Sequence, residues 1–204
     1  MNALELLEQS QVMPVMVIKD ITTAVDLARA LTQGGVRTLE ITLRSESALE
    51  AIRLISQEVP EALVGAGTVR TPAQYEAAIK AGAAFCVSPG LTPELASVAR
   101  QSAIPFLPGI ATASESMFAA DQGFNVQKLF PAEAIGGIGL LKALYGPLPD
   151  IVFCPTGGIH AQNARQYLAL PNVKCVGGSW LTPESAVTER RWDAITALAR
   201  DASA

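Results

Sequence analysis

The stretch TLEITLRSESALEAIRLISQEVPEALVGAGTV, residues 38–69, holds two short apolar runs on either side of a segment with helical spacing of apolar residues. The first run begins near Thr38 and the second near Leu63, and Ser47 with Glu50 forms a capping box at the start of the segment between them. A strand, a helix and a second strand in this order are typical of a parallel βαβ unit. The fold is predicted by extending this unit along the chain.

The same alternation continues through the whole sequence. Strand starts are expected near Val15, Thr38, Leu63, Phe85, Pro105, Val126, Ile151 and Val173. They recur about every 23 residues, so eight units fill the 204 residues, at the small end of the (β/α)8 barrel range. An open doubly wound sheet, the alternative, more often has about five or six strands. We therefore predict an α/β protein with one domain over residues 1–204, a (β/α)8 TIM barrel with a short N-terminal helix.

Composition and charge exclude several classes of protein. Hydrophobic residues make up 50% and charged residues 17% of the chain, which is typical of a globular domain. The net charge is −4 and no basic run is present, so nucleic acid is not an expected partner. No uncharged stretch approaches the ~20 residues that cross a bilayer, so no membrane association is expected.

The N-terminus and the cysteines indicate a cytoplasmic protein. Glu5 and Glu8 stand where a secretion signal needs positive charge followed by an apolar stretch. Cys86, Cys154 and Cys175 are odd in number, form no CxxC pair and lie in strand-like segments. This pattern is typical of buried thiols in a reducing compartment.

Lys128 is the residue on which the predicted chemistry depends. It lies inside the expected strand FNVQKLFP, residues 124–131, on the same face as Val126 and Phe130. Burial penalises an ammonium group and so favours the neutral amine, which can attack a ketone. Lys128 is therefore a candidate Schiff-base lysine, and a structural ion pair inside the barrel is the alternative interpretation.

Two further charged residues belong to the expected second strand or follow it. Glu40 shares a strand face with Thr38 and Thr42, and a carboxylate inside a barrel needs either a partner or a role in proton transfer. Arg44 comes just after the strand end, where its guanidinium can hold a substrate carboxylate through two hydrogen bonds. A surface arginine on a loop is the alternative for this residue.

Glycine pairs follow the expected seventh and eighth strands, in CPTGGI at 154–159 and VGGSW at 176–180. Glycine lets backbone N–H groups approach an anion closely. The loops after strands seven and eight of (β/α)8 barrels commonly bind phosphate. These two loops therefore predict a phosphorylated substrate.

Neither a metal nor a nucleotide cofactor is expected. His160 is the only histidine, and no carboxylate cluster has the spacing of metal ligands. His160 is therefore interpreted as a helix-start or surface residue, with a minor contact to the ligand phosphate as the alternative. The glycines at 65 and 67 lack the third glycine of a dinucleotide fingerprint and are interpreted as a turn that presents Thr68.

Six blocks of this sequence resemble the 2-keto-3-deoxy-6-phosphogluconate (KDPG) and 4-hydroxy-2-oxoglutarate (KHG) aldolase family. They are GVRTLEITLR at 35–44, VGAGTV at 64–69, SPGLT at 88–92, KLFPAE at 128–133, CPTGGI and VGGSW. The blocks run in family order, and the resemblance covers nearly the whole chain. It implies a metal-independent class I aldolase on a (β/α)8 barrel, without an organic cofactor and usually trimeric.

The resemblance also implies the reaction. Such enzymes cleave 2-dehydro-3-deoxy-6-phosphogluconate to pyruvate and glyceraldehyde 3-phosphate in the Entner–Doudoroff route. Many members also cleave 4-hydroxy-2-oxoglutarate to pyruvate and glyoxylate.

The family pattern assigns roles to positions that match it in this sequence. By resemblance Lys128 forms the Schiff base and Glu40 moves protons. The matching substrate-binding positions are Arg44 and Thr68 at the pyruvyl carboxylate, Pro89 and Phe130 along the pyruvyl pocket, and Gly157, Gly158 and Ser179 at the phosphate. Two positions depart from the pattern: Gln127 replaces an apolar residue and should face the helix layer, and His160 replaces a small hydroxyl residue.

Two rival functions are compatible with parts of this pattern. A phosphosugar isomerase barrel uses acid–base pairs and the same phosphate loops but forms no iminium. A catalytically silent barrel that binds a phosphorylated ligand keeps the loops and loses the chemistry. Lys128 disfavours the first, and Lys128 together with Glu40 disfavours the second.

Overall fold

The computed structural model describes residues 1–203, in which short strands alternate with helices. The strands are β1 (Val12–Met16), β2 (Thr38–Thr42), β3 (Leu63–Gly67), β4 (Cys86–Val87), β5 (Phe106–Leu107), β6 (Gly109–Ile110), β7 (Val126–Leu129), β8 (Val152–Pro155) and β9 (Val176–Gly178). The α-helices are α1 (Ala3–Leu7), α2 (Ala24–Gln33), α3 (Ala48–Glu58), α4 (Pro72–Lys80), α5 (Pro93–Arg100), α6 (Ala113–Asp121), α7 (Gly137–Tyr145), α8 (Ala164–Leu168), α9 (Glu184–Thr188) and α10 (Trp192–Ser203). The 3₁₀ helices are η1 (Ile21–Thr23) and η2 (Glu133–Ile135). The predicted α/β alternation and the short N-terminal helix are confirmed.

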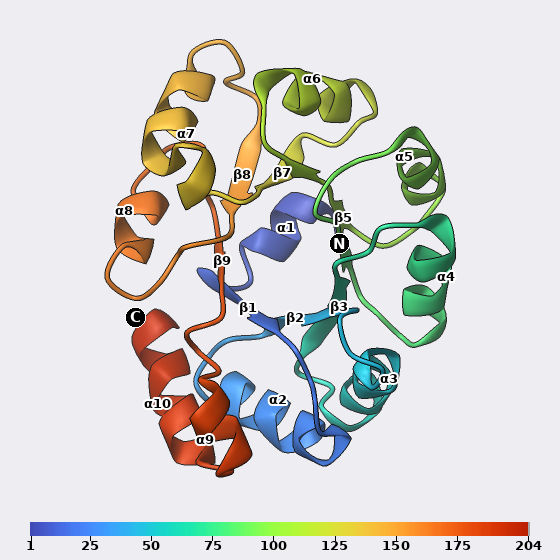
Figure 1. The fold of residues 1–204 in the computed structure, drawn as a ribbon, viewed down its shortest axis with the longest axis vertical. Coiled ribbons are helices and arrows are strands. Elements are labelled where there is room, and N and C mark those ends of the chain that lie inside the picture. Colours follow the sequence, from blue (N-terminus) through green and yellow to red (C-terminus); the bar gives the residue numbers. More distant parts are fainter. Residues whose placement is uncertain (204) are drawn as a thin grey trace.

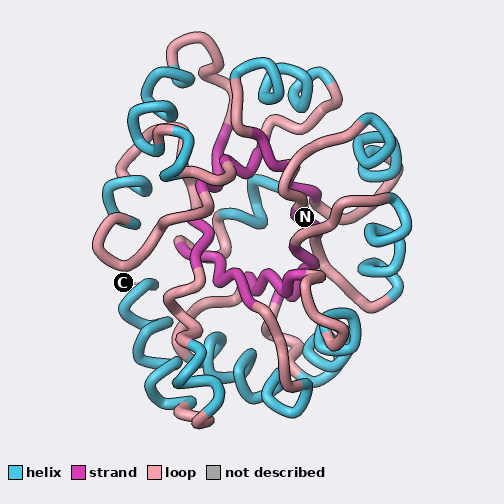
Figure 2. The backbone as a smooth tube through the Cα atoms, in the orientation of Figure 1, coloured by secondary structure: helices cyan, strands magenta, loops and turns pink. Residues whose placement is uncertain are grey.

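The strands form two parallel sheets. One has six strands in the order β5-β4-β3-β2-β1-β9, and the other has three in the order β6-β7-β8. Single parallel bridges, Phe153 with Val173 and Thr156 with Gly177, connect the β8 segment to the β9 segment. Pro108 separates β5 from β6, so one expected strand is divided in two. Figure 2 shows the strands around the centre of the molecule, with the helices other than α1 outside them.

The expected strand starts agree with the structure except at the two ends of the series. β1 begins at Val12 rather than near Val15, and β9 begins at Val176 rather than near Val173. Both shifts have the same origin, because β1 and β9 pair with each other from Val12 and Val176 onward. The ladder between these two strands, and not the apolar run in either one, decides where each begins.

Helix caps are mostly placed as their sequence signals indicate. The side chains of Thr71 and Thr92 accept hydrogen bonds from Gln74 N–H and Leu95 N–H at the starts of α4 and α5. The expected capping box at Ser47 is wrong, because this hydroxyl instead donates to the carbonyl of Ile18 at 2.5 Å. A tertiary contact with the loop after β1 thus replaces the local cap.

Two apolar regions lie on the two faces of the strands. The larger fills the space between strands and outer helices, and the smaller lies inside the ring of strands. The side chains of Leu6 and Leu7 on α1 are fully buried in the inner region against residues such as Met13 and Phe85. Figure 1 shows α1 within the ring. Because α1 and apolar side chains occupy this interior, polar groups that reach inward from the strands need partners of their own.

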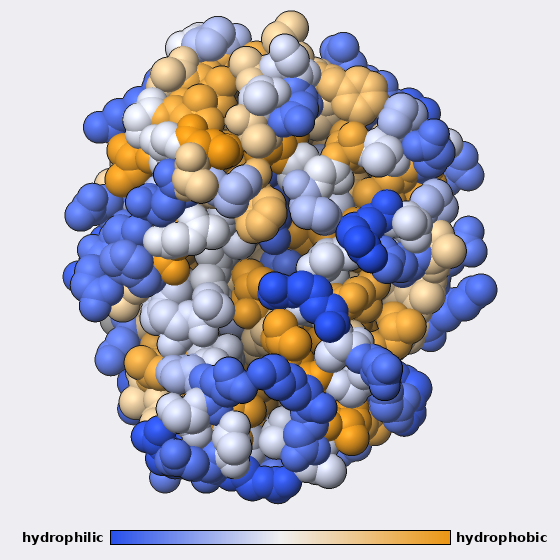
Figure 3. Space-filling model, viewed as in Figure 1, coloured by the Kyte–Doolittle hydropathy of each residue, from blue (hydrophilic) through white to orange (hydrophobic). Residues whose placement is uncertain are grey.

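The outer surface is largely hydrophilic. Figure 3 shows hydrophilic side chains over most of the periphery of one face, with apolar ones between them nearer the centre. No helix within residues 1–203 has the length and apolar character needed to cross a membrane.

Candidate active site

Lys128 and Glu40 meet inside the ring of strands. Lys128 Nζ lies 3.3 Å from Glu40 Oε1, and the two side chains are only 8% and 2% exposed. Lys128 is on β7, whereas Glu40 is on β2, 88 residues earlier in the chain. The pair is therefore a buried ion pair whose two partners are both reactive groups.

The strand alternation around Lys128 also places its neighbour. Gln127 is fully buried and faces the helix layer, as expected from the sequence. Its side-chain amide donates to the carbonyls of Ser116 and Phe124 at 3.0 and 2.8 Å, and its oxygen accepts from Ser116 Oγ at 2.7 Å. These bonds hold β7 against α6, so Lys128 points away from the helices.

Gly67 provides the space that the Glu40 carboxylate occupies. It ends β3 opposite Thr42, and a Cβ atom built on it would lie 2.6 Å from Glu40 Cγ. The sequence alone predicts only a turn for the glycines of VGAGTV, and this role of Gly67 is visible only in the structure. The sequence feature that could have indicated this role is a glycine at the end of one strand, next to a strand that carries a buried carboxylate.

Replacing Gly67 with alanine is expected to displace the Glu40 carboxylate and to lower the turnover number about 10- to 100-fold, because misplacement of a catalytic group by about 1 Å costs roughly this much. Gly139→Ala on α7 is the matched control, since a Cβ atom there meets nothing within 4 Å. Steady-state kinetics and thermal melting of both variants test this expectation. Wild-type turnover in Gly67→Ala would contradict it.

Phe130 and Pro89 lie close to Lys128. Lys128 Nζ is 5.4 Å from the centroid of the Phe130 ring, a cation–π distance. Gly109, which pairs with Lys128 across the β6–β7 ladder, approaches the backbone of Pro89 so closely that a Cβ atom would not fit. Pro89 itself is exposed just after β4. The structure therefore brings both expected pyruvyl-pocket residues to the neighbourhood of Lys128.

Arg44 and Thr68 follow adjacent strands at the same edge of the sheet. The turn after β2 is held against β3 by a 2.8 Å hydrogen bond from Leu43 N–H to the Gly67 carbonyl. Thr68 has a left-handed backbone with φ of 59°, a conformation that is rare for threonine and is often found at functional sites. Arg44 is exposed, and within residues 1–203 its guanidinium forms no hydrogen bond or ion pair with a protein group.

The loop after β8 has the geometry expected of an anion-binding turn. Gly157 and Gly158 have φ values of 103° and 80°, which side chains rarely adopt. Their carbonyls accept hydrogen bonds from Glu133 N–H and the Asn163 amide, at 3.0 and 3.2 Å. Within the described part of the chain, the Gly158 N–H group donates to no protein acceptor. This backbone donor is thus left for a ligand.

Glu133 and Tyr167 support this loop, and neither residue was predicted from the sequence. The Tyr167 hydroxyl donates to Glu133 Oε1, and burial raises the pKa of Tyr167 well above its usual range, with the Glu133 hydrogen bond adding to it. The tyrosine is therefore protonated and remains a donor. A Cβ atom on Gly158 would lie 2.6 Å from Glu133 Cβ, so the loop packs directly on this residue. The only available signal was the position of Glu133 in KLFPAE.

Ser179 and His160 lie on two loops at this side of the molecule. Ser179 is exposed immediately after β9, and Gly177 of that strand packs against the Thr156 side chain of the β8 loop. His160 is exposed in the turn before α8, where its Nδ1 lies 2.7 Å from Gln162 Oε1. Its interpretation as a helix-start or surface residue is confirmed.

All three cysteines are buried free thiols, as the sequence predicts. Cys154 pairs with Lys128 across the β7–β8 ladder. A hydrogen bond with Cys154, together with burial, raises the pKa of Cys175 well above its usual range. The Cys175 thiol therefore stays neutral. No group of three or more His, Cys, Asp or Glu residues within residues 1–203 has the arrangement of a metal site.

Several known proteins are similar to this chain over nearly its whole length. A family model described as KDPG and KHG aldolase matches residues 4–198. A 2-dehydro-3-deoxy-phosphogluconate aldolase of Dickeya dadantii is 54% identical over 203 residues, which cover 100% of this chain and 95% of that protein. A KHG/KDPG aldolase of Escherichia coli K12 is 51% identical over 201 residues, covering 98% of this chain and 94% of that protein.

A solved structure is also similar over nearly the whole chain. The crystal structure of a KDPG aldolase from Legionella pneumophila superposes with a TM-score of 0.97 at 46% identity and covers 99% of this chain and 98% of that chain. It holds pyruvate captured at low pH as a covalent carbinolamine intermediate.

Proposed function

This chain belongs to the KDPG and KHG aldolase family, and from that premise we propose that it is a class I aldolase that cleaves 2-dehydro-3-deoxy-6-phosphogluconate to pyruvate and glyceraldehyde 3-phosphate. We extend the proposal to cleavage of 4-hydroxy-2-oxoglutarate to pyruvate and glyoxylate, because a 51% identical relative is named for both substrates. The observation that carries the proposal is the buried pair of Lys128 and Glu40, 3.3 Å apart.

The reaction begins with an attack on the substrate ketone. Transfer of a proton from Lys128 to Glu40 gives the neutral amine, which adds to C2. Glu40 returns the proton as the carbinolamine loses water to give an iminium, which accepts electrons from the C3–C4 bond. Glu40 takes the proton of the C4 hydroxyl as that bond breaks, and the aldehyde leaves. The remaining enamine is protonated at C3, and hydrolysis of the iminium releases pyruvate and restores Lys128.

The other site residues bind the two ends of the substrate. We place the pyruvyl carboxylate at Arg44 and Thr68, the pyruvyl carbons along Pro89 and Phe130, and the phosphate at Gly157, Gly158 and Ser179. The unpartnered Arg44 guanidinium and the free Gly158 N–H group support these assignments. No metal or organic cofactor takes part in the steps that we propose.

A pyruvate-release assay tests the function. Purified protein is incubated with 2-dehydro-3-deoxy-6-phosphogluconate, and pyruvate is measured by a coupled assay. An aldolase releases one pyruvate per substrate. A phosphosugar isomerase, or a barrel that only binds a phosphorylated ligand, releases none, and that outcome would refute the proposal.

We also propose the finer architecture that the resemblance implies. The two sheets and the bridges that link them support one closed (β/α)8 barrel, in which β5 and β6 together are the fifth strand and residues 1–204 form one domain. We propose a cytoplasmic homotrimer. Light scattering at micromolar concentration should then give three times the chain mass of 21.4 kDa, and a monomer mass would refute the trimer.

Replacing Gly158 with valine is expected to lower kcat/KM for the phosphorylated substrate far more than for 4-hydroxy-2-oxoglutarate, which has no phosphate. The new side chain would displace Glu133 and the left-handed backbone, and with them the N–H donors of the loop. Gly123→Val is the matched control, because Gly123 has a similar φ of 91° and no atom near its Cβ position. Equal losses with both substrates would contradict the phosphate assignment.

A further inference from the structure

A cavity of about 580 Å³ reaches both Ser179 of the proposed phosphate site and Arg44 of the proposed carboxylate site. It lies between the end of β1, the start of α2 and the segment from the end of β9 to α9, and its size is in the range of small-molecule sites. Arg44 and Ser179 line it, whereas Lys128 and Glu40 do not. The cavity is thus an outer chamber that shares its inner wall with the proposed substrate site.

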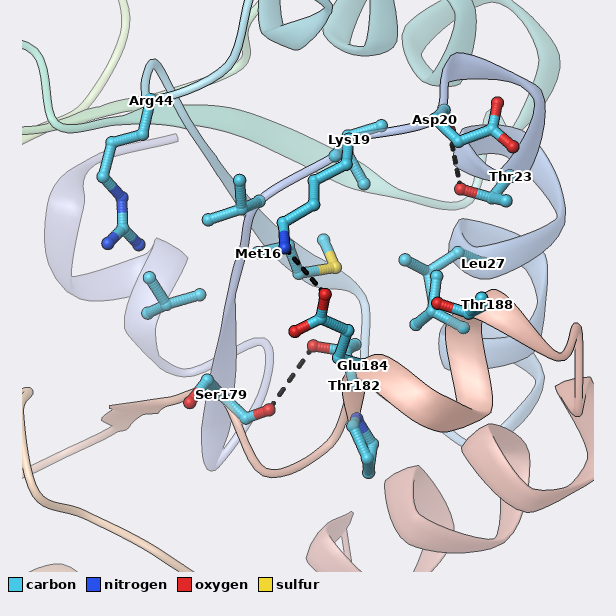
Figure 4. A pocket seen from close by; sticks show the side chains of 15 residues that line it. Met16, Lys19, Asp20, Thr23, Leu27, Arg44, Ser179, Thr182, Glu184 and Thr188 are labelled. Atoms are coloured by element: carbon cyan, nitrogen blue, oxygen red, sulfur yellow. Dashed lines mark hydrogen bonds and ion pairs between the residues drawn. The ribbon is translucent and has the colours of Figure 1, made fainter.

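A single ion pair crosses this chamber. Lys19 Nζ lies 2.7 Å from Glu184 Oε1, and the two side chains are 71% and 77% exposed. Figure 4 shows the amine of Lys19 directed at the Glu184 carboxylate, with Arg44 and Ser179 on the left of the view. Their hydrogen bond lowers the pKa of Glu184, so this carboxylate is charged near neutral pH.

The ion pair is weakly held. Exposed lysine–carboxylate pairs contribute little to stability, because water solvates both partners nearly as well. The two residues are 165 positions apart, and each extends from a segment beyond a strand end. A doubly charged phosphate in the chamber would attract the ammonium of Lys19 more strongly than one carboxylate does.

The remaining charges of the chamber leave Lys19 as the exchangeable group. Asp20 accepts hydrogen bonds from Thr22 N–H and Thr22 Oγ1 at 2.9 and 2.8 Å, so its carboxylate is engaged in capping η1. Arg44 is assigned to the pyruvyl carboxylate. Only the Lys19–Glu184 pair combines a cation and an anion that can separate without breaking a helix cap.

We infer that Lys19 binds the substrate's phosphate by exchanging its partner Glu184 for it, so that Glu184 is an internal competitor for the anion. This inference rests on the proposed function. Lys19 would then supplement the backbone donors at the phosphate, and it stays paired with Glu184 until the substrate enters. The two residues of the pair therefore have opposite effects on affinity, which distinguishes an exchange from a structural ion pair.

Two variants test the inference through the sign of their effects. Lys19→Met removes the cation and is expected to raise KM for 2-dehydro-3-deoxy-6-phosphogluconate about 5- to 10-fold. This loss of affinity is what one charge-assisted hydrogen bond contributes in a partly exposed site. Glu184→Gln removes the competitor and is expected to lower the same KM about 2- to 3-fold. Values of kcat, and KM for 4-hydroxy-2-oxoglutarate, are expected to change less than about 2-fold, since neither residue reaches the reacting carbons.

Lys80→Met is the matched control, because Lys80 is an exposed lysine at the end of α4, remote from the chamber. If Lys19→Met and Glu184→Gln both raise KM, or if neither changes it, the exchange is refuted. If KM for the two substrates changes equally, the effect is not directed at phosphate and the inference also fails.

A binding experiment separates this inference from the proposed function. Titration of the wild type and the variants with inorganic phosphate, followed by NMR chemical shifts, needs no turnover. Weaker binding in Lys19→Met and tighter binding in Glu184→Gln support the exchange even if the wild type releases no pyruvate. Unchanged phosphate affinity in both variants refutes the exchange even if the wild type is an active aldolase.

Discussion

Lys128→Arg is expected to abolish cleavage of both proposed substrates and covalent trapping of pyruvate. Arginine keeps the positive charge beside Glu40 but has no amine that can form an imine. The wild type, incubated with pyruvate and borohydride, should gain the mass of one reduced pyruvyl group per chain and lose activity. Peptide mapping should locate the group on Lys128, and the variant should remain unmodified.

Lys19 is the internal control for this experiment. It lies beyond the end of β1, and its side chain is 71% exposed, so water stabilises its ammonium form and it should not be labelled. An adduct on Lys19, or full activity in Lys128→Arg, would refute the Schiff-base assignment. Thermal melting of the variant shows whether the larger guanidinium is accommodated, which separates a lost nucleophile from a lost fold.

Glu40→Gln is expected to lower turnover by roughly 10²- to 10⁴-fold, which corresponds to about 3 to 5 kcal/mol in the activation barrier. Glutamine keeps the size and hydrogen-bonding capacity of glutamate but cannot carry the proton of the C4 hydroxyl. Imine formation with pyruvate should survive in part, because the Lys128 amine is still present. Activity within about threefold of wild type would remove Glu40 from the proton-transfer role.

Comparing Glu40→Gln with Gly67→Ala separates the chemical role of Glu40 from its placement. The first variant keeps the position and removes the acid–base function, whereas the second keeps the carboxylate and displaces it. Both should retain the single lysine that pyruvate and borohydride label. A larger loss in Glu40→Gln than in Gly67→Ala is expected, since a displaced carboxylate can still move a proton in a fraction of the molecules.

The function and the site residues could be predicted from the sequence because reactive side chains interrupt apolar strands. Lys128 and Glu40 are visible in the sequence as charges within runs that periodicity assigns to buried strands. The capping box at Ser47 shows where such local reasoning fails. Its residues fit the local pattern, but the hydroxyl bonds instead to Ile18, 29 residues away.

The sequence by itself determined the α/β alternation, the faces of the strands and the residue types that carry the chemistry, because periodicity and capping depend on residues that are close along the chain. Only the tertiary structure decided that Lys128 and Glu40 lie 3.3 Å apart, that Gly67 leaves room for the carboxylate, and that Lys19 reaches Glu184. Partners separated by 88 and 165 positions meet through the lateral order and register of the strands and the packing of the loops that follow them. Those features arise from contacts over the whole ring, and no local pattern in the sequence encodes them.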